Sequence, residues 1–197
     1  MLERIVEVSS GVDFETFAVE RIFEPLGMDN TYYYRDGAHP NLATLYRVNE
    51  DGELVENPDM PWMNGSYISG GGGLHSTPED YLQFALLLLN DGELNGTRLI
   101  GRRSAELMRS AFISDELPGR NPGEGYGLGV RVITDATARQ TYLSEGSFGW
   151  SGAFNTHFFI DPVERVVGIY MTQSAFFRGA FQLMDDFETA VMQAVID

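Results

Sequence analysis

Polar and apolar positions at the start of the chain follow helical spacing and predict two consecutive helices. Residues 1–8 carry their apolar side chains on one face, and Gly11 supplies a stop signal. Asp13 is a suitable N-cap for the second helix, which we expect to end at Pro25 and Gly27. Because a domain rarely begins in mid-helix without a lead-in, this start leads us to expect further chain upstream.

Three more helices are predicted further along the chain. The strongest start signal is at Thr77, an N-cap that is followed by Pro78 and two acidic residues, and this helix should run to Asn90. Apolar periodicity predicts another helix over residues 102–111 and a last, amphipathic helix over residues 179–195.

Short apolar or alternating runs between these helices predict strands. Residues 43–48 and 53–56 flank turn formers and predict a hairpin. Further strands are predicted over residues 126–133, 139–144, 153–160 and 166–172, and the short turns between them favour an antiparallel meander. The pattern is that of an α+β fold. Residues 1–117 should form a mostly helical part with irregular loops, and residues 118–197 the antiparallel strands and a C-terminal helix.

The composition excludes several kinds of partner and chemistry. The chain has 197 residues, 29 acidic and 13 basic, and its net charge of −16 argues against nucleic acid or an anionic membrane surface as a partner. All 13 basic residues are arginines, and cysteine is absent as well. Disulfides, thiolate metal sites, catalytic cysteine, Schiff bases, Walker-type phosphate binding and a complete serine–lysine pair within this chain are therefore excluded.

The sequence also carries no sign of a membrane segment. No stretch reaches the roughly 20 apolar residues of a transmembrane helix, so we expect no membrane span. The N-terminal residues lack the basic and then apolar pattern of a signal peptide, so none is expected at this end. Cytoplasm and periplasm are both compatible with this composition.

Three local patterns resemble functional motifs but have simpler interpretations. Residues 149–153 nearly match the nucleophile elbow G-x-S-x-G, but we expect a strand to follow and not a helix. The alternating glycines of residues 123–129 resemble a phosphate loop, but they enter a strand, where glycine allows close backbone approach. His39, His75 and His157 lack the spacing of zinc ligands, so neither a metal nor another cofactor is expected.

A serine–histidine pair of Ser151 with His157 is a further possibility. If both residues lie on one strand they share a face, but the rise of the strand separates them by roughly 20 Å. We therefore do not expect them to act together.

Four stretches, in order along the chain, resemble the serine hydrolase superfamily that contains class C β-lactamases, DD-peptidases and β-lactamase-like esterases. They are residues 21–31 (RIFEPLGMDNT), 72–80 (GGLHSTPED), 126–129 (YGLG) and 149–156 (GWSGAFNT). The resemblance covers nearly the whole chain. It implies part of a β-lactamase/transpeptidase-like fold, with residues 1–117 in the helical lobe and residues 118–197 in the α/β lobe.

The resemblance also implies a mechanism. In this family a serine in S-x-x-K forms an acyl-serine intermediate, and a tyrosine in Y-x-N assists proton transfer. A third motif (K-T-G, H-x-G or W-x-G) lies on a strand at the cleft edge. Only the third is present here, as Trp150, Ser151 and Gly152, while Ala153 matches the residue whose backbone N–H donates to the oxyanion. The catalytic serine, lysine and tyrosine are expected upstream.

The third motif bears on the substrate class that the resemblance implies. The family's lysine at the position of Trp150 helps bind the carboxylate of penicillins and peptides, and tryptophan cannot form this ion pair. The W-x-G form is more usual in the esterases, so carboxylic-ester hydrolysis is favoured over lactam hydrolysis. Gly72 falls where class C enzymes place an aromatic residue beside the substrate, which implies a more open pocket and a substrate contact at Gly72.

The expected function is thus the C-terminal portion of a serine hydrolase that acts on a small-molecule ester or amide and is inactive alone. A β-lactamase or DD-peptidase and a non-catalytic β-lactamase-like binding module are the alternatives. In a purely structural interpretation, Trp150 is a core aromatic and residues 151–152 are a strand end or a bulge. Because the family's N-terminal strands complete its sheet, we expect an exposed sheet edge and an apolar helix face here. An N-terminal segment or a second chain would cover them.

Overall fold

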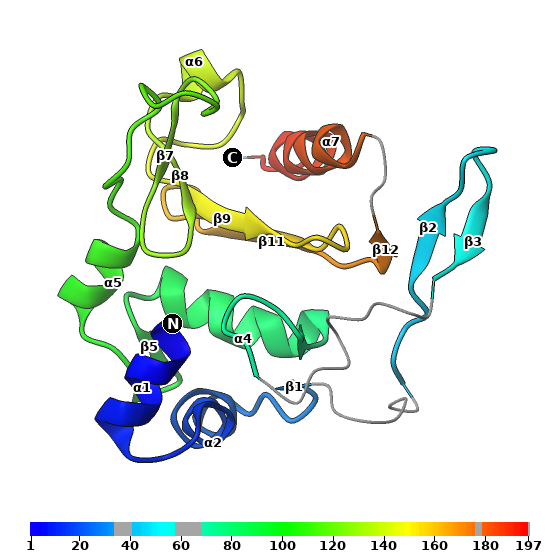
Figure 1. The fold of residues 1–197 in the computed structure, drawn as a ribbon. Helices are drawn as coiled ribbons and strands as arrows, with labels where there is room; N and C mark the ends of the chain where they lie inside the picture. The colour runs from blue at the N-terminus through cyan, green and yellow to red at the C-terminus, as the bar shows by residue number, and fades with distance from the viewer. Residues whose placement is uncertain (34–40, 58–67, 176–178, 197) are drawn as a thin grey trace.

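A five-stranded antiparallel sheet packed between helices organises the chain (Figure 1). The structure, a computed structural model, describes residues 1–33, 41–57, 68–175 and 179–196. Helix α7 (Ala180–Gln193) covers one face of the sheet, and α4 (Pro78–Leu89) covers the other. The N-terminal helices pack on the side of α4 that faces away from the sheet (Figure 1). This arrangement confirms the predicted α+β fold.

The N-terminal helices follow local signals closely. They are α1 (Leu2–Ser10), α2 (Phe14–Ala18), the π-helical turn η1 (Val19–Phe23) and α3 (Glu24–Leu26). As predicted, Gly11 ends α1 at a left-handed φ of 80°, and the Asp13 carboxylate accepts a hydrogen bond from the Thr16 N–H at 3.0 Å. Gly27 ends α3 in the same way. Pro25 does not end the helix: it lies in the first turn of α3, where proline is tolerated.

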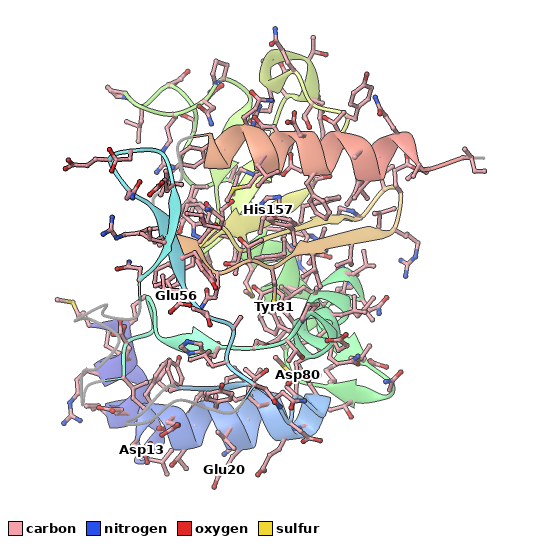
Figure 2. All side chains as sticks on the ribbon, turned by 90° about the vertical axis from the view of Figure 1, so that its right-hand side faces the viewer. Asp13, Glu20, Glu56, Asp80, Tyr81 and His157 are labelled. Carbon is pink, nitrogen blue, oxygen red and sulfur yellow. The ribbon has the colours of Figure 1, made fainter. Side chains whose placement is uncertain are left out.

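The start of α4 is hydrogen-bonded to the segment that follows α3. The Thr77 side chain accepts a hydrogen bond from the Asp80 N–H at 3.2 Å, which confirms the predicted cap. Asp80 is itself buried (Figure 2), and its carboxylate accepts hydrogen bonds from the Asn30 N–H at 2.7 Å and the Thr31 hydroxyl at 2.8 Å. The segment after α3 is therefore fixed to the first turn of α4.

The main sheet is a meander, as predicted. Its strands are β7 (Glu124–Tyr126), β8 (Arg131–Ile133), β9 (Phe148–Ser151), β10 (His157–Asp161) and β11 (Val166–Tyr170). Each pairs antiparallel with the next in sequence. Because side chains alternate between the two faces, Phe158 and Ile160 pack toward α4, whereas Ile133 and Phe159 pack toward α7.

Two predicted strands are wrong. Residues 126–133 are not one strand, because the chain ends β7 at Tyr126, turns through residues 127–130 and returns as β8. Residues 139–144 are not a strand either. The Asp135 side chain caps a single helical turn, α6 (Ala136–Arg139), by accepting from the Ala138 N–H at 2.8 Å.

The hairpin around the W-x-G motif also differs from the prediction. The strand expected over residues 153–160 begins only at His157, because residues 152–156 form a turn. Strand β9, which precedes this turn, was not among the predicted strands. Close approach, the interpretation given to the alternating glycines, is confirmed at three of the four. A Cβ at Gly123, Gly125 or Gly127 would lie 2.2, 2.5 or 2.2 Å from a neighbouring atom, whereas a Cβ at Gly129 would meet nothing within 4 Å.

Smaller elements complete the described chain. They are β1 (Tyr32–Tyr33), β2 (Tyr46–Val48), β3 (Leu54–Glu56), β4 (Leu74–His75), β5 (Glu93–Leu94), β6 (Thr97–Arg98), α5 (Arg102–Met108) and β12 (Ser174–Ala175). The predicted hairpin is confirmed as β2 and β3, with β12 parallel to β2. Within the described ranges, every helix is too short or too polar to cross a bilayer.

One apolar helix face and one strand edge lack a partner in the described chain. Helix α1 has no buried residue, and Leu2 and Val8 are 76% and 70% exposed. Among the described residues, β11 pairs with β10 alone, so its outer edge meets no other strand. An exposed sheet edge and an apolar helix face are therefore both present, as the sequence led us to expect.

Candidate functional site

The W-x-G residues lie at the end of β9, where the neighbouring strand has already ended. On one side Trp150 and Ser151 pair with β10. On the other side β8 pairs only with Phe148 and Gly149, so within the described chain the ladder stops before Trp150. These two residues therefore present a free strand edge, at the position where the resemblance places substrate contacts.

The turn after β9 is held by its own polar groups. The Gly152 N–H donates to the Thr156 carbonyl at 2.7 Å, and a Cβ at Gly152 would lie 2.3 Å from the Thr156 hydroxyl oxygen, so a larger residue there would displace the Thr156 side chain. The Asn155 amide donates to the carbonyl and the hydroxyl oxygen of Ser174, each at 2.9 Å. Ala153 is exposed in this turn, and its N–H meets no acceptor in the part of the chain that the structure describes. That N–H is available to an oxyanion.

Trp150 is a half-exposed aromatic beside the free edge. Its side chain is 46% exposed, so the interpretation of Trp150 as a core aromatic is wrong. The ring contacts that of Tyr126 edge to face, with centroids 5.2 Å apart and an interplanar angle of 67°. The Arg120 guanidinium lies 5.4 Å from the centroid of the Tyr126 ring, a cation–π distance. The contact with Tyr126 on β7 thus holds the Trp150 ring beside the free edge of β9.

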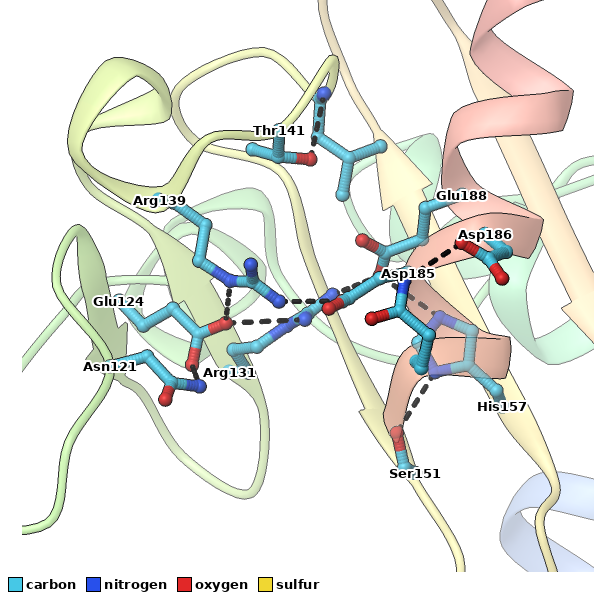
Figure 3. Close-up of polar contacts among 12 residues, drawn as sticks. Asn121, Glu124, Arg131, Arg139, Thr141, Ser151, His157, Asp185, Asp186 and Glu188 are labelled. Atoms are coloured by element: carbon cyan, nitrogen blue, oxygen red, sulfur yellow. Dashed lines mark hydrogen bonds and ion pairs between the residues drawn. The ribbon is translucent and has the colours of Figure 1, made fainter. Parts of the chain in front are cut away.

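Ser151 and His157 are in direct contact, contrary to the expectation from the sequence. Ser151 Oγ lies 2.9 Å from His157 Nδ1 (Figure 3). The expected separation of roughly 20 Å assumed a single strand. Instead the turn over residues 152–156 folds the chain back, and Ser151 on β9 stands directly opposite His157 on β10. The two side chains share the face of the sheet that packs under α7 (Figures 2 and 3).

A buried carboxylate continues this contact. His157 Nε2 lies 3.0 Å from Glu188 Oε1 on α7, and the same oxygen accepts a hydrogen bond from the Arg131 guanidinium (Figure 3). His157, Glu188 and Arg131 side chains are only 1%, 3% and 16% exposed. Burial alone raises the pKa of Glu188, but the hydrogen bond from His157 and the charge of Arg131 outweigh it and lower the pKa overall.

The charge network extends to the outer strand. Arg131 contacts Glu124 on β7 at 3.3 Å, and Glu124 also accepts a hydrogen bond from Arg139. Arg139 in turn bonds Asp185 of α7 at 2.6 Å (Figure 3). These residues were not predicted as part of the site. One signal was available for Glu188, which stands four residues after Met184, on the apolar face of its helix.

The other predicted residues lie outside this hairpin. Gly72 is exposed ahead of β4, and a Cβ there would meet nothing within 4 Å. His75 stacks on Tyr32, with ring centroids 5.8 Å apart, and its Nδ1 lies 3.1 Å from the Gly73 carbonyl oxygen. His39 falls outside the described residues.

A meander sheet under a C-terminal helix, with the W-x-G turn at a free strand edge, defines a protein of the β-lactamase-like serine hydrolase class. The family model for β-lactamases matches residues 1–191, and the chain belongs to this family. The predicted β-lactamase/transpeptidase-like fold is confirmed.

Known relatives of the chain include proteins of several kinds. Protein Rv1367c of Mycobacterium tuberculosis is 33% identical, over 78% of this chain and 42% of its own length. Lovastatin esterase of Penicillium rubens is 27% identical, over 87% of this chain and 48% of its own length. The solved structure of EstCE1, a hydrolase with promiscuous acyltransferase activity, superposes with a TM-score of 0.80 at 25% identity and covers 95% of this chain and 54% of EstCE1. The chain spans about half the length of the curated relatives it matches.

Proposed function

We propose that this chain is the C-terminal portion of a serine hydrolase that works through an acyl-serine intermediate and hydrolyses carboxylic esters. The observation that carries the proposal is Trp150 at the free edge of β9, half-exposed and fixed by Tyr126. A neutral indole at this position offers a flat apolar surface and no cation for a substrate carboxylate. The esterase and acyltransferase names among its relatives support the same substrate class.

The described hairpin would supply the binding half of this site. Trp150, Ser151 and Gly152 would contact the substrate along the strand edge, with Gly72 on the opposite wall. The Ala153 N–H would be one of the two donors to the oxyanion. The chain has no lysine, so the nucleophile–lysine pair has to come from another segment. We assign residues 1–117 to the helical lobe of this enzyme and residues 118–197 to its α/β lobe.

The uncovered edge of β11 and the exposed apolar face of α1 fit the same proposal. A segment that brings the S-x-x-K serine would also be a source of strands for β11, because an unpaired edge is a template for a further strand and bare apolar side chains are costly in water. An upstream part of the same polypeptide is the simplest source of such strands. A second chain is the other.

The test is to read and express the complete open reading frame that contains this chain. We expect in-frame S-x-x-K and Y-x-N motifs upstream and hydrolysis of a neutral p-nitrophenyl ester in preference to nitrocefin, whose ring carries a carboxylate. Trp150→Lys should shift that preference toward nitrocefin, with Trp150→Phe as the matched control that keeps an apolar ring. A reading frame without the serine motif, or a preference for nitrocefin in the unaltered enzyme, would refute the proposal.

A further inference from the structure

We propose that Asn155 is a positioning residue that orients the Ala153 N–H, the candidate oxyanion donor, out of the turn after β9. The backbone N–H of Asn155 fixes the peptide group that carries this donor, and its side chain is held by the segment that follows β11. The part of the inference that concerns catalysis rests on the proposed function. The part that concerns the turn rests only on hydrogen bonds and burial.

The first step is the orientation of the peptide group between Gly152 and Ala153. The Gly152 carbonyl accepts a hydrogen bond from the Asn155 N–H at 3.1 Å, so this carbonyl points into the turn. A trans peptide group is planar, with its C=O and its N–H on opposite sides. The Ala153 N–H therefore points out of the turn, which agrees with its lack of an acceptor within the described ranges.

The second step is the backbone conformation of Asn155. Its φ of 60° lies in the left-handed region, which asparagine adopts more readily than most residues. In this conformation the Asn155 N–H reaches the Gly152 carbonyl, and the Thr156 carbonyl accepts a hydrogen bond from the Gly152 N–H at 2.7 Å. Both polar backbone groups of Gly152 are thus bonded, and the peptide group that follows has little freedom to rotate.

The third step is the side chain of Asn155, which is buried. Its amide group donates to the carbonyl oxygen and the hydroxyl oxygen of Ser174, each at 2.9 Å. Ser174 belongs to β12, and β12 pairs in parallel with β2 (Figure 1). The turn that carries the donor is therefore bonded to a small sheet that is separate from the five-stranded one.

Thr172, between β11 and β12, holds the same turn through its hydroxyl group. The hydroxyl donates to the carbonyl oxygens of Phe154 and Asn155, at 3.2 and 3.1 Å. The side chain of Phe154 packs against Leu45 and Ala175. Both residues whose carbonyls bond Thr172 are therefore held by contacts from outside the turn.

These contacts bear on catalysis because an oxyanion donor has to be oriented before charge develops on the substrate. A donor that must reorient during the reaction stabilises the transition state less. A short turn that contains Gly152 is free to adopt several backbone conformations unless other contacts select one. Asn155 supplies such contacts from a buried position and touches no reacting atom, so it is a positioning residue.

The orientation is tested by hydrogen exchange, followed by NMR on the ¹⁵N-labelled 197-residue chain. We expect the Asn155 N–H to be protected and the Ala153 N–H to exchange freely, because only the first has an acceptor. Thr172→Val should lower the protection of the Asn155 N–H by about fivefold, the effect of one net hydrogen bond, whereas Thr172→Ser keeps the hydroxyl and the protection. A protected Ala153 N–H, or a freely exchanging Asn155 N–H in the unaltered chain, would overturn the inference.

The catalytic consequence is tested in the complete enzyme with an ester and the matching thionoester, in which sulfur replaces the carbonyl oxygen. Sulfur accepts hydrogen bonds less well than oxygen, so a well-oriented oxyanion donor favours the ester. Asn155→Gly permits the left-handed backbone but removes the side chain that bonds Ser174. The ratio of kcat/KM for the ester over the thionoester should fall by about tenfold in this variant, since removal of a whole donor costs about 100-fold or more.

This ratio separates positioning from stability, because partial unfolding lowers both rates equally. Thr172→Val should lower the ratio too and Thr172→Ser should retain it, which keeps the test decisive if Asn155→Gly does not fold. Thr141→Val is the control: it removes a hydroxyl that accepts from the Leu143 N–H on another loop, and the ratio should not change. An unchanged ratio in Asn155→Gly and Thr172→Val would overturn the positioning role. A complete protein without esterase activity would refute the proposed function and leave the exchange result standing.

Discussion

Ser151 and His157 meet at 2.9 Å because a five-residue turn places them directly opposite each other on β9 and β10. The same turn contains the exposed Ala153. It follows the last two residues of β9, which no longer pair with β8. The geometry of the candidate site therefore depends on this one hairpin. Its stability and its charges are open to direct measurement.

Gly152→Ala should destabilise the hairpin. The added Cβ would lie 2.3 Å from the Thr156 hydroxyl oxygen, so the Thr156 side chain must leave its position, and we expect a loss of about 1 kcal/mol in the free energy of unfolding. Gly72→Ala is the matched control, since its Cβ meets nothing within 4 Å. Urea denaturation of the two variants measures the difference. Equal losses at both positions would contradict the crowded turn.

Arg131→Met should be strongly destabilising because it leaves Glu188 buried without its counter-ion. Breaking a buried ion pair by removing one partner costs about 3–5 kcal/mol, again measurable by urea denaturation. Arg103→Ala removes an exposed pair with Glu106 and should cost less than about 1 kcal/mol, since the Arg103 side chain is 83% exposed. If Arg131→Met lowers the free energy of unfolding no more than Arg103→Ala does, the ion pair between Arg131 and Glu188 is exposed to solvent and the account is contradicted.

The stability contributed by Glu188 should depend on pH in a definite direction. Burial raises the pKa of Glu188, but His157 and Arg131 outweigh this effect, so the folded-state pKa lies below the ordinary carboxyl value of 4.5. A group with a depressed folded pKa binds protons more readily in the unfolded chain. Its contribution is therefore complete well above pH 4.5 and is lost as the pH falls through the folded value.

Glu188→Gln removes this titration. The difference in unfolding free energy between the unaltered chain and Glu188→Gln should be largest at neutral pH and should shrink steadily as the solution is acidified below pH 4.5. Urea denaturation over a series of pH values gives this difference directly. If this difference in unfolding free energy stays constant or grows on acidification, the pKa of Glu188 is not lowered in the folded chain.

The uncovered surfaces should make the 197-residue chain self-associate when it is studied alone. Sedimentation velocity over a range of concentrations is expected to show species larger than the monomer, because the β11 edge and the α1 face are both exposed. Replacing Leu2 and Val8 of α1 with glutamate should weaken association without disturbing packing, since both side chains are largely exposed. A monodisperse monomer at all concentrations would contradict this expectation.

Helix starts were predictable from the sequence where their cap signals are local, whereas the helix predicted over residues 102–111 ends already at Met108. The caps at Asp13 and Thr77 need only a side chain and the N–H three residues later, so the residues themselves specify the structure. Strand boundaries were less predictable. The run over residues 126–133 looks continuous in its apolar pattern, yet the backbone reverses after Tyr126. Reversal depends on pairing with a neighbour, which a local pattern does not contain.

The candidate site also combines residues that local sequence predicts with contacts that it does not predict. Trp150, Ser151, Gly152 and Ala153 follow one another in sequence, so a motif could point to all four. The contacts beneath them join residues far apart in the chain: Glu188 is 31 residues from His157 and 57 from Arg131. Their meeting depends on how α7 packs on the finished sheet. The one sign of these contacts in the sequence was Glu188, a charged residue on the apolar face of its helix.

The central claim, that this chain binds substrate for a nucleophile located elsewhere, is tested most directly by intact-mass spectrometry after treatment with a fluorophosphonate. The measurement compares the 197-residue chain with the product of the complete reading frame. The account predicts no adduct on the chain alone and one adduct on the complete product, at the serine of an upstream S-x-x-K. A fold-dependent adduct on a serine of the 197-residue chain would contradict it.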